Sequence, residues 1–373
     1  MAAKIRKRSS SARPIEAVGT STAAFVRTAK RGPVDRPVQV RRLADFQRTF
    51  GNPLPDSGMG YAVQHFFDNG GTEALIVRVA SGAQISAPAL EGQKRGLWAL
   101  EKADLFGLLC IPPVQGADIG RQTRDAATAY CARRRALFIA DPSSSWQSAA
   151  QAKAGLQAGF MTRSAHAALF FPLLKAPDQR SVAPCGAVAG VLARTDAAQG
   201  VWKAAAGRDA TLKGVSAPPV ALNAAQSAEL NELGINCLRS LAGSGTVVWG
   251  SRTLAGITQP SPEWKYVPVR RLASLIEESI ARGTRWVTFE PNDEPTWAKL
   301  SLRVGDFLHG LFKRGAFAGW KVQESYYVKC DRSIMTQGDI DAGLVNIEVG
   351  FAPLKPAEFV VIRIQQMTRK PPP

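Results

Sequence analysis

The sequence predicts an α/β fold for the larger part of the chain and an α+β fold for a smaller C-terminal part. Hydrophobic residues make up 45% of the 373 residues, which is enough to bury sizeable cores. Apolar runs alternate with helix-forming stretches through the middle of the chain, as in a mainly parallel sheet covered by helices on both faces. This alternation stops at Gln259-Pro-Ser-Pro, and we place a domain boundary there.

Four segments follow from this division. We expect an N-terminal arm over residues 1–22, an α/β domain over 23–258, an α+β domain over 259–355 and a C-terminal arm over 356–373. Residues 1–13 are polar and basic without periodicity, which predicts a flexible arm. The chain ends in Lys370-Pro-Pro-Pro, which cannot extend a strand.

The α/β part begins with local signals of both helix and strand. Leu43, Phe46 and Phe50 share one helical face, and Gly51 ends that helix. The continuous β-branched run from Ala74 is typical of a strand buried on both faces. The remaining expected elements are an extended stretch at 23–27, a helix around 61–67, strands at 105–111, 136–140, 167–171 and 246–250, and helices at 121–135, 146–160, 186–197 and 224–233.

The α+β part is expected to hold two amphipathic helices and one sheet. Leu272, Leu275, Ile276 and Ile280 form the apolar face of the first helix, and Gly283 ends it. The second helix begins with cap residues and Pro295, and its apolar residues from Trp297 to Leu311 recur at helical spacing. Strands are expected at 285–289, 326–328, 344–351 and 359–364.

The chain is strongly basic. Its formal net charge is +17, and residues 1–50 hold 12 Lys and Arg against three acidic residues. Such an excess favours a polyanionic partner, which can be nucleic acid, an anionic membrane or an acidic protein surface. The aromatic residues sit at core spacing rather than between basic residues, which disfavours direct nucleic-acid binding as the main function.

Residues that could carry chemistry are scattered. His166 and Asp141 flank predicted strands and would allow a hydrolase triad, but no serine has a nucleophile context. Glu290, Asp293 and Glu294 resemble helix-capping residues more than a metal site, and the Gly243-Ser-Gly-Thr turn precedes a strand where a phosphate cradle needs a helix. We therefore expect no catalytic residue, no cofactor and no metal, so that the chain is not an enzyme.

Compartment and redox state follow from what the sequence lacks. The apolar stretches, such as 105–114, fall short of the roughly 20 residues of a membrane span, so we expect no stable membrane insertion. No apolar segment follows the basic N-terminus, so we expect synthesis in the cytoplasm without a secretory signal. The five cysteines show no metal-ligand spacing, and they are either reduced buried thiols or partners in an intermolecular disulfide.

Sequence blocks along nearly the whole chain resemble the contractile tail sheath family of phage tails and related injection systems. The resemblance runs through Arg13-Pro-Ile-Glu-Ala-Val-Gly-Thr, Arg31-Gly-Pro-Val-Asp-Arg-Pro and Gly190-Val-Leu-Ala-Arg-Thr-Asp. It is strongest in three blocks: residues 276–297, which include Ala281-Arg-Gly-Thr-Arg-Trp-Val-Thr-Phe-Glu-Pro-Asn-Asp-Glu-Pro, then Cys330-Asp-Arg with Met335-Thr, and Val349-Gly-Phe-Ala-Pro-Leu-Lys-Pro-Ala-Glu-Phe. One departure is that a short basic stretch replaces the Pro-Gly-Val-Tyr type of segment that usually opens the family.

The resemblance implies a mechanical function. Such proteins stack as hexameric rings around an inner tube in a stretched state, and contraction drives the tube through a cell envelope. It implies four kinds of partner: further copies of the chain, an inner tube protein with an acidic outer surface, the baseplate and a tail terminator. The implied location is the virion tail, assembled in the bacterial host cytoplasm, with a phage-tail-like bacteriocin or an extracellular injection system as the alternative.

Two sets of residues are candidates for assembly. Lys299, Arg303, Lys313 and Arg314 lie on polar faces of the second amphipathic helix, and we expect them to face the acidic tube. A solvated helix face is the alternative. The run Phe359, Val360, Val361, Ile362, Arg363 and Ile364 favours a strand close to the chain end. Terminal arms link neighbouring subunits in the family, so we expect this run to pair with another copy's sheet. A strand in the chain's own sheet is the alternative.

Overall fold

The computed structural model describes residues 14–53, 58–85, 94–114, 117–255, 262–354 and 359–368. These residues form two compact units. The larger unit is Gly19–Ser274, and the smaller unit joins the chain up to Val18 with the chain from Leu275 onwards. The division falls inside the helix α7 (Val267–Gly283), further along the chain than the expected boundary at 258/259.

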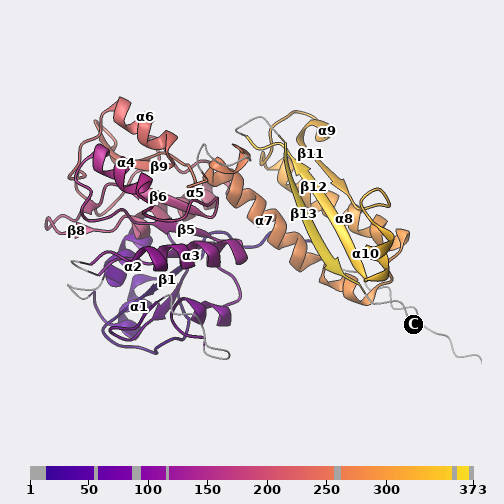
Figure 1. The fold of residues 1–373 in the computed structure, drawn as a ribbon, viewed down its shortest axis with the longest axis horizontal. Coiled ribbons are helices and arrows are strands. Elements are labelled where there is room, and N and C mark those ends of the chain that lie inside the picture. Colours follow the sequence, from indigo (N-terminus) through magenta and orange to yellow (C-terminus); the bar gives the residue numbers. More distant parts are fainter. Residues whose placement is uncertain are drawn as a thin grey trace, which may run out of the picture. The chain divides into compact units, whose positions relative to one another are not determined.

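The larger unit is built on an eight-stranded sheet with the order β10-β9-β6-β5-β4-β1-β3-β2 (Figure 1). Six strands are parallel to one another, while β2 pairs antiparallel with β3 and β10 antiparallel with β9. The sequence predicted a mainly parallel sheet, and this is confirmed. The strands are β1 (Ala23–Arg27), β2 (Val38–Val40), β3 (Ala74–Arg78), β4 (Leu108–Cys110), β5 (Leu137–Ala140), β6 (Ala167–Phe171), β9 (Ile235–Leu241) and β10 (Gly245–Trp249).

Helices cover both faces of this sheet. Alternate residues of β1 show the division, because Phe25 packs into one apolar core and Val26 into the other. The first core is closed by α1 (Leu43–Phe50), α2 (Gly58–Asp68) and α5 (Cys185–Gln199). The second is closed by the 3-10 helix η1 (Gly96–Lys102), α3 (Arg121–Arg133), α4 (Ala149–Gln157) and α6 (Ala224–Glu232). The short pair β7 (Leu174–Lys175) and β8 (Ser181–Val182) and the 3-10 helix η2 (Pro262–Lys265) complete this unit.

Two glycines let α5 approach α2. A Cβ at Gly186 would lie 2.0 Å from the Ala62 carbonyl oxygen, and one at Gly190 would lie 2.5 Å from the Phe66 carbonyl oxygen. These glycines are four residues apart, so they share one face of α5. Larger side chains here would push the two helices apart and open the core beneath them.

Both edges of the large sheet are protected. Along β10, the Gly207 N–H donates to the Val248 carbonyl oxygen and the Val248 N–H donates to the Ala210 carbonyl oxygen, each at 2.9 Å. The segment around these residues therefore covers that edge. The opposite edge, β2, is three residues long and is flanked by Pro37 and Arg41. Short, proline-flanked and charged edges resist pairing with further strands.

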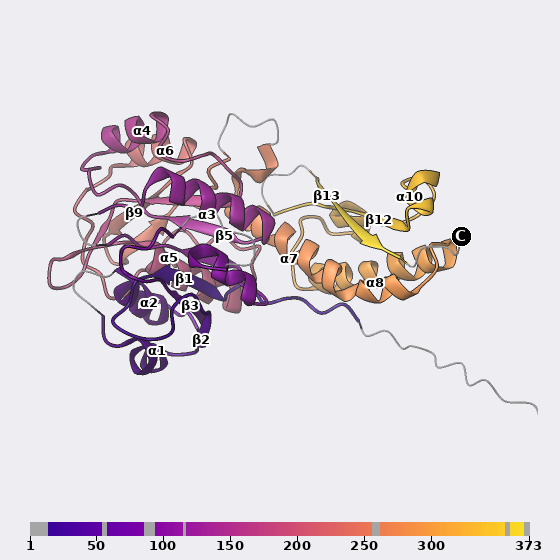
Figure 2. The ribbon, with the colours of Figure 1, turned by 60° about the horizontal axis from the view of Figure 1, so that its bottom comes forward.

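The smaller unit holds a three-stranded antiparallel sheet with the order β11-β12-β13. Its strands are β11 (Tyr326–Lys329), β12 (Leu344–Phe351) and β13 (Val360–Met367), and its helices are η3 (Arg285–Phe289), α8 (Glu294–Lys313), α9 (Val322–Ser325) and α10 (Gln337–Asp341) with the end of α7. Figure 2 shows α8 along one side of β12 and β13. The smaller α+β part predicted from the sequence is thus confirmed.

Helix α8 begins where its sequence predicts. Asp293 is the N-cap residue, and its Oδ1 accepts a hydrogen bond from the Thr296 N–H at 2.9 Å. Trp297, Leu300 and Val304 are buried, as their spacing indicates. Glu290, Asp293 and Glu294 therefore mark a helix start. Among the described residues, no group of three or more His, Cys, Asp or Glu side chains could hold a metal ion.

One expected strand is wrong. Residues 285–289 form the 3-10 helix η3 rather than a strand. In a strand, Val287 and Phe289 would lie on the same face, yet Val287 is buried and Phe289 is 83% exposed. The apolar run is therefore not evidence of a buried face, and the five residues instead make the turn between α7 and α8.

The segment before Gly19 lies against α7 in the smaller unit. The Val18 N–H donates to Ser279 Oγ at 3.1 Å, and Ile15 is buried against Gly283. Residues 14–22 have no regular secondary structure, whereas residues 1–13 of the expected arm lie outside the described residues. In the described part of the chain, every helix is too short or too polar to cross a bilayer.

Candidate assembly site

The run proposed for strand exchange is a real strand that extends further than expected. β13 covers Val360–Met367 and pairs along its whole length with β12, with Val360 opposite Phe351 and Met367 opposite Leu344. Val360, Ile362 and Ile364 are buried, while Val361 is 46% exposed. In this single chain the strand completes the chain's own sheet, and pairing with another copy stays a prediction.

The outward face of the small sheet carries a charged network. Arg363 Nε donates to Glu348 Oε2 at 3.1 Å, and Tyr327 OH donates to Glu348 Oε1 at 3.2 Å. Burial and the neighbouring Glu348 carboxylate raise the pKa of Tyr327, so its hydroxyl stays protonated and available as a donor. This network joins β11, β12 and β13 across one face.

The four basic residues of the α8 region differ in their surroundings. Lys299, Lys313 and Arg314 are exposed. Arg303 is half-buried and its guanidinium carbon lies 4.7 Å from the centre of the Trp286 ring. Lys299 and Lys313 are therefore accessible to a partner molecule, whereas Arg303 also packs against Trp286 of its own unit.

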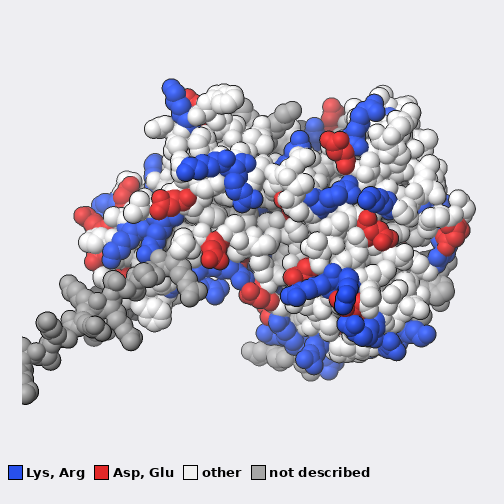
Figure 3. Space-filling model, turned by 180° about the vertical axis from the view of Figure 1, so that it is seen from behind, with Lys and Arg blue, Asp and Glu red and all other residues white. Residues whose placement is uncertain are grey.

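Positive charge is concentrated outside the C-terminal part. Residues 19–274 hold 29 Lys and Arg against 17 Asp and Glu, whereas residues 275–373 hold 13 against 12. Figure 3 shows the basic side chains in several separate groups over one face of the molecule, with acidic side chains between them. The α8 residues are therefore a local basic feature of a nearly neutral region.

A buried ion pair in the larger unit was not predicted from the sequence. Arg271 on α7 and Asp196 on α5 are paired through two hydrogen bonds, Nη1 to Oδ1 at 2.8 Å and Nη2 to Oδ2 at 2.5 Å. Both side chains are 5% exposed. Such a two-pronged arginine–carboxylate pair is directional as well as strong.

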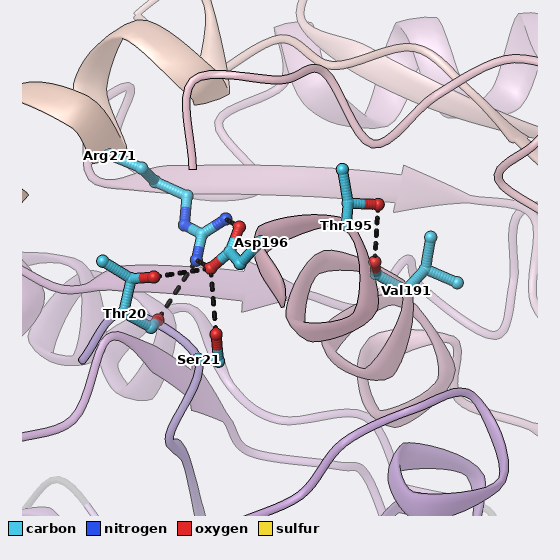
Figure 4. Close-up of polar contacts among 6 residues, drawn as sticks. All are labelled: Thr20, Ser21, Val191, Thr195, Asp196 and Arg271. Atoms are coloured by element: carbon cyan, nitrogen blue, oxygen red, sulfur yellow. Dashed lines mark hydrogen bonds and ion pairs between the residues drawn. The ribbon is translucent and has the colours of Figure 1, made fainter. Parts of the chain in front are cut away.

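The same pair fastens the segment that enters β1 (Figure 4). Thr20 Oγ1 donates to Asp196 Oδ2 at 2.7 Å and Ser21 Oγ donates to the same oxygen at 3.1 Å. Arg271 Nη2 also donates to the Thr20 carbonyl oxygen at 3.1 Å. Three chain segments that are far apart in the sequence therefore meet at one carboxylate. We call Thr20, Ser21, Asp196 and Arg271 the anchor cluster.

The imagined hydrolase triad is not assembled. Asp141 Oδ1 accepts a hydrogen bond from the Cys185 backbone N–H at 2.8 Å, and burial raises the pKa of Asp141 to about 7. His166 Nδ1 lies 3.0 Å from the Ala136 carbonyl oxygen. Each side chain thus contacts backbone atoms. The serine next to His166, Ser164, accepts a hydrogen bond through its Oγ from the His166 backbone N–H at 3.0 Å.

A pocket lies at the carboxyl ends of β4, β5 and β6, where α/β enzymes commonly bind ligands. Its charged side chains already have partners. Asp118 accepts from Ser143 Oγ at 2.6 Å, and Arg180 pairs with Asp178 at 2.5 Å and stacks on Tyr61. The Gly243 turn is the tight connection between β9 and β10. The charged side chains that line the pocket are thus engaged within the chain.

All five cysteines are free and buried. Burial raises the pKa of Cys237 and Cys330 to about 12, which keeps both as thiols. The expected burial of the thiols is confirmed, and an intermolecular disulfide stays the alternative.

Two family models match this chain. Residues 121–254 match the phage tail sheath protein central domain, and residues 259–367 match the phage tail sheath C-terminal domain. The tail sheath protein of Vibrio phage KVP40 is 28% identical over 49% of this chain, and that of Enterobacteria phage T4 is 28% identical over 41%. The matched parts span only 26% and 22% of those two relatives.

Solved structures match almost end to end. The contracted sheath complex of an extracellular contractile injection system, PVC, is 29% identical, covers 95% of this chain and 93% of its own, and has a TM-score of 0.75. The contracted helical sheath of the anti-feeding prophage is 28% identical, covers 98% of both chains, and has a TM-score of 0.75. With the two domain models, these likenesses show that the chain belongs to the contractile tail sheath family of structural proteins.

Proposed function

We propose that this protein polymerises as stacked hexameric rings around an inner tube and contracts to drive the tube through a target cell envelope. The observation that carries the proposal is the likeness to a contracted sheath over 95% of the chain. Contraction would re-dock folded units without refolding them, and the larger unit would supply new lateral contacts.

The terminal strand would link the copies. Phe359, Val360, Val361, Ile362, Arg363 and Ile364 would pair with the sheet of a neighbouring copy instead of the chain's own. β13 is an outer strand of the small sheet, so β12 of a neighbouring copy could pair with it in the same way. Backbone pairing of this kind persists while the rest of each subunit rotates.

The α8 region would face the tube in the stretched state through Lys299, Arg303, Lys313 and Arg314. Each exposed ion pair contributes only about 0.2–1 kcal/mol. Weak pairs repeated on every subunit suit a contact that breaks during a single contraction. The tube would therefore present acidic side chains at the matching positions.

Further partners would be a baseplate and a tail terminator, and the working location would be a tail assembled in the bacterial cytoplasm. The curated relatives come from phages, whereas the solved structures come from an injection system and an anti-feeding prophage. A virion tail is the main proposal, and a bacteriocin or injection device is the second. In either setting we propose no enzymatic activity, no cofactor and no direct nucleic-acid contact.

Negative-stain microscopy of the full chain, expressed with and without the tube protein of its own operon, tests polymerisation. We expect long striated cylinders that persist after nuclease treatment. Small discrete oligomers under every condition, or cylinders that dissolve with nuclease, would contradict the proposal and favour a nucleic-acid-binding protein. Turnover of an ester substrate that is lost in His166→Ala would instead favour a hydrolase.

The tube contact has its own test. In Lys299→Glu/Lys313→Glu, two exposed cations of the α8 region become anions, so we expect the amount of tube-loaded stretched sheath to fall by about tenfold, the effect of losing about 1.4 kcal/mol per subunit contact. Lys203→Glu, an exposed lysine of the larger unit, is the matched control. Normal tube loading in the double variant would rule out the α8 region as the contact.

A further inference from the structure

β13 is held by side-chain contacts beyond its pairing with β12. The Gln366 amide donates from Nε2 to the Ala281 carbonyl oxygen at 3.0 Å and to Thr284 Oγ1 at 2.9 Å. The Thr368 N–H and its Oγ1 both donate to the Gly343 carbonyl oxygen, at 2.7 Å and 2.9 Å. The acceptors belong to the end of α7 and to the turn before β12. Hydrogen bonds to these two elements therefore hold the C-terminal end of the strand in place.

The apolar pattern of β13 leaves its register partly undefined. Val360, Ile362 and Ile364 point into the core, and a slip by one residue would turn them outward. A slip by two residues keeps the alternation, because one β-branched residue then replaces another at the sites opposite Phe351 and Val349. Hydrophobic burial alone therefore distinguishes poorly between these two registers.

The polar end of the strand does distinguish them. In the slip that brings Met367 opposite Asn346, Gln366 would occupy the site of Ile364, which is 5% exposed. The amide would lose its acceptors on Ala281 and Thr284 and enter an apolar site. A buried amide without partners is strongly disfavoured. Thr368 would also leave the Gly343 carbonyl oxygen.

We infer that Gln366 and Thr368 select the register of β13 on β12, and that they do so for whichever copy supplies the strand. The second half of this inference rests on the strand exchange proposed above. Every acceptor lies outside β13, on the unit that receives the strand. A neighbouring copy has the same acceptors, so we expect it to select the same register. A two-residue slip would lengthen a link between copies by about 7 Å, and a fixed register prevents this.

Cysteine pairs in the full chain report the register. Asn346 faces Gln365 in the observed pairing, and Gln365 Nε2 donates to Asn346 Oδ1 at 3.1 Å. Asn346→Cys/Gln365→Cys therefore reports the observed register on oxidation, and Asn346→Cys/Met367→Cys reports the slipped one. The native cysteines are buried and should not compete.

The decisive comparison adds Gln366→Val and Thr368→Val to the slipped reporter. We expect the slipped disulfide to rise about tenfold over the unmodified reporter, which corresponds to about 1.4 kcal/mol of lost preference. Gln365→Val in the same reporter is the matched control, because this neighbouring glutamine lies on the exposed face, and we expect no rise. An equal yield in control and test would overturn the inference.

Two further readouts keep the result clear. If the double variant does not fold, Thr368→Val alone should raise the slipped product in the same direction by a smaller factor, and no rise would again overturn the inference. Non-reducing electrophoresis of assembled sheath separates the two proposals. Links between chains support strand exchange and links within chains contradict it, whichever register is found.

Discussion

The two units differ in how completely they bury their own apolar side chains. Of the large hydrophobic residues that are exposed in the described parts of the chain, Val34 alone belongs to the larger unit. Phe289 and Trp320 of the smaller unit are 83% and 97% exposed, and Leu302, Leu354, Phe359, Val361 and Met367 join them. The described part of the larger unit exposes one large apolar side chain and that of the smaller unit exposes seven. We propose that some of these seven side chains contact other copies.

The largest effect should come from breaking the anchor cluster of the larger unit. Asp196→Ala leaves the Arg271 guanidinium buried without its carboxylate, and removal of one member of a buried pair costs about 3–5 kcal/mol. We expect a fall of this size in the free energy of unfolding, measured with urea.

The control is an ion pair of the smaller unit that has one exposed member. Arg363 is 83% exposed where it meets Glu348, and the 11% exposed Glu348 keeps its hydrogen bond from Tyr327 OH, so Arg363→Met should cost less than Asp196→Ala, about 1 kcal/mol. Equal losses in the free energy of unfolding would contradict the difference that we expect between the buried ion pair of the larger unit and the partly exposed one of the smaller unit.

A smaller, pH-dependent effect should come from Asp141. Burial raises the folded-state pKa to about 7 from the ordinary 3.8, so between these values the folded chain binds more protons than the unfolded one. Stability should therefore fall as pH rises from about 4 to 7, by up to about 4 kcal/mol, and then level off.

Asp141→Asn should remove this dependence. Its amide oxygen can still accept from the Cys185 N–H, while no charge develops on the side chain. The measurement is the free energy of unfolding at several pH values. A variant that keeps the slope of the parent would show that another group titrates in this window.

The smallest effect on stability should come from the exposed apolar residues of the smaller unit. Phe289→Ser and Trp320→Ser should change the free energy of unfolding by less than about 0.5 kcal/mol, because neither side chain is buried. Both should nevertheless lower the yield of cylinders seen by microscopy. Val34→Ser, in the larger unit, is the control and should leave that yield unchanged. Full assembly of all three variants would show that the exposed groups are not contacts.

Elements with a local signal could be predicted from the sequence. The spacing of Trp297, Leu300 and Val304 identified α8, and the β-branched run from Val360 identified β13. Residues 285–289 were assigned to a strand because their composition is apolar, and composition does not reveal which face is buried. β2 and β9 were missed, since β2 is only three residues long and Asn236 and Arg239 interrupt the apolar run of β9.

The decisive polar contacts could not be predicted. Arg271 and Asp196 are 75 positions apart and neither stands in a short motif, so only the folded chain brings them together. Gln366 reads as a polar residue after a strand, and its acceptors lie about 80 positions away on α7. Long-range pairs of this kind leave no periodic trace in the sequence. The elements that carry the proposed assembly residues could be predicted, but the long-range contacts that hold these elements could not.

The covered edges of the large sheet have a consequence for growth. Gly207 and Ala210 occupy the hydrogen-bonding row of β10, and β2 is too short and too charged to recruit a partner. Edge-to-edge pairing of two large sheets, which can lead to aggregation, is therefore disfavoured at both edges. β11 and β13 are the outer strands of the small sheet, so we expect backbone pairing between copies to take place there.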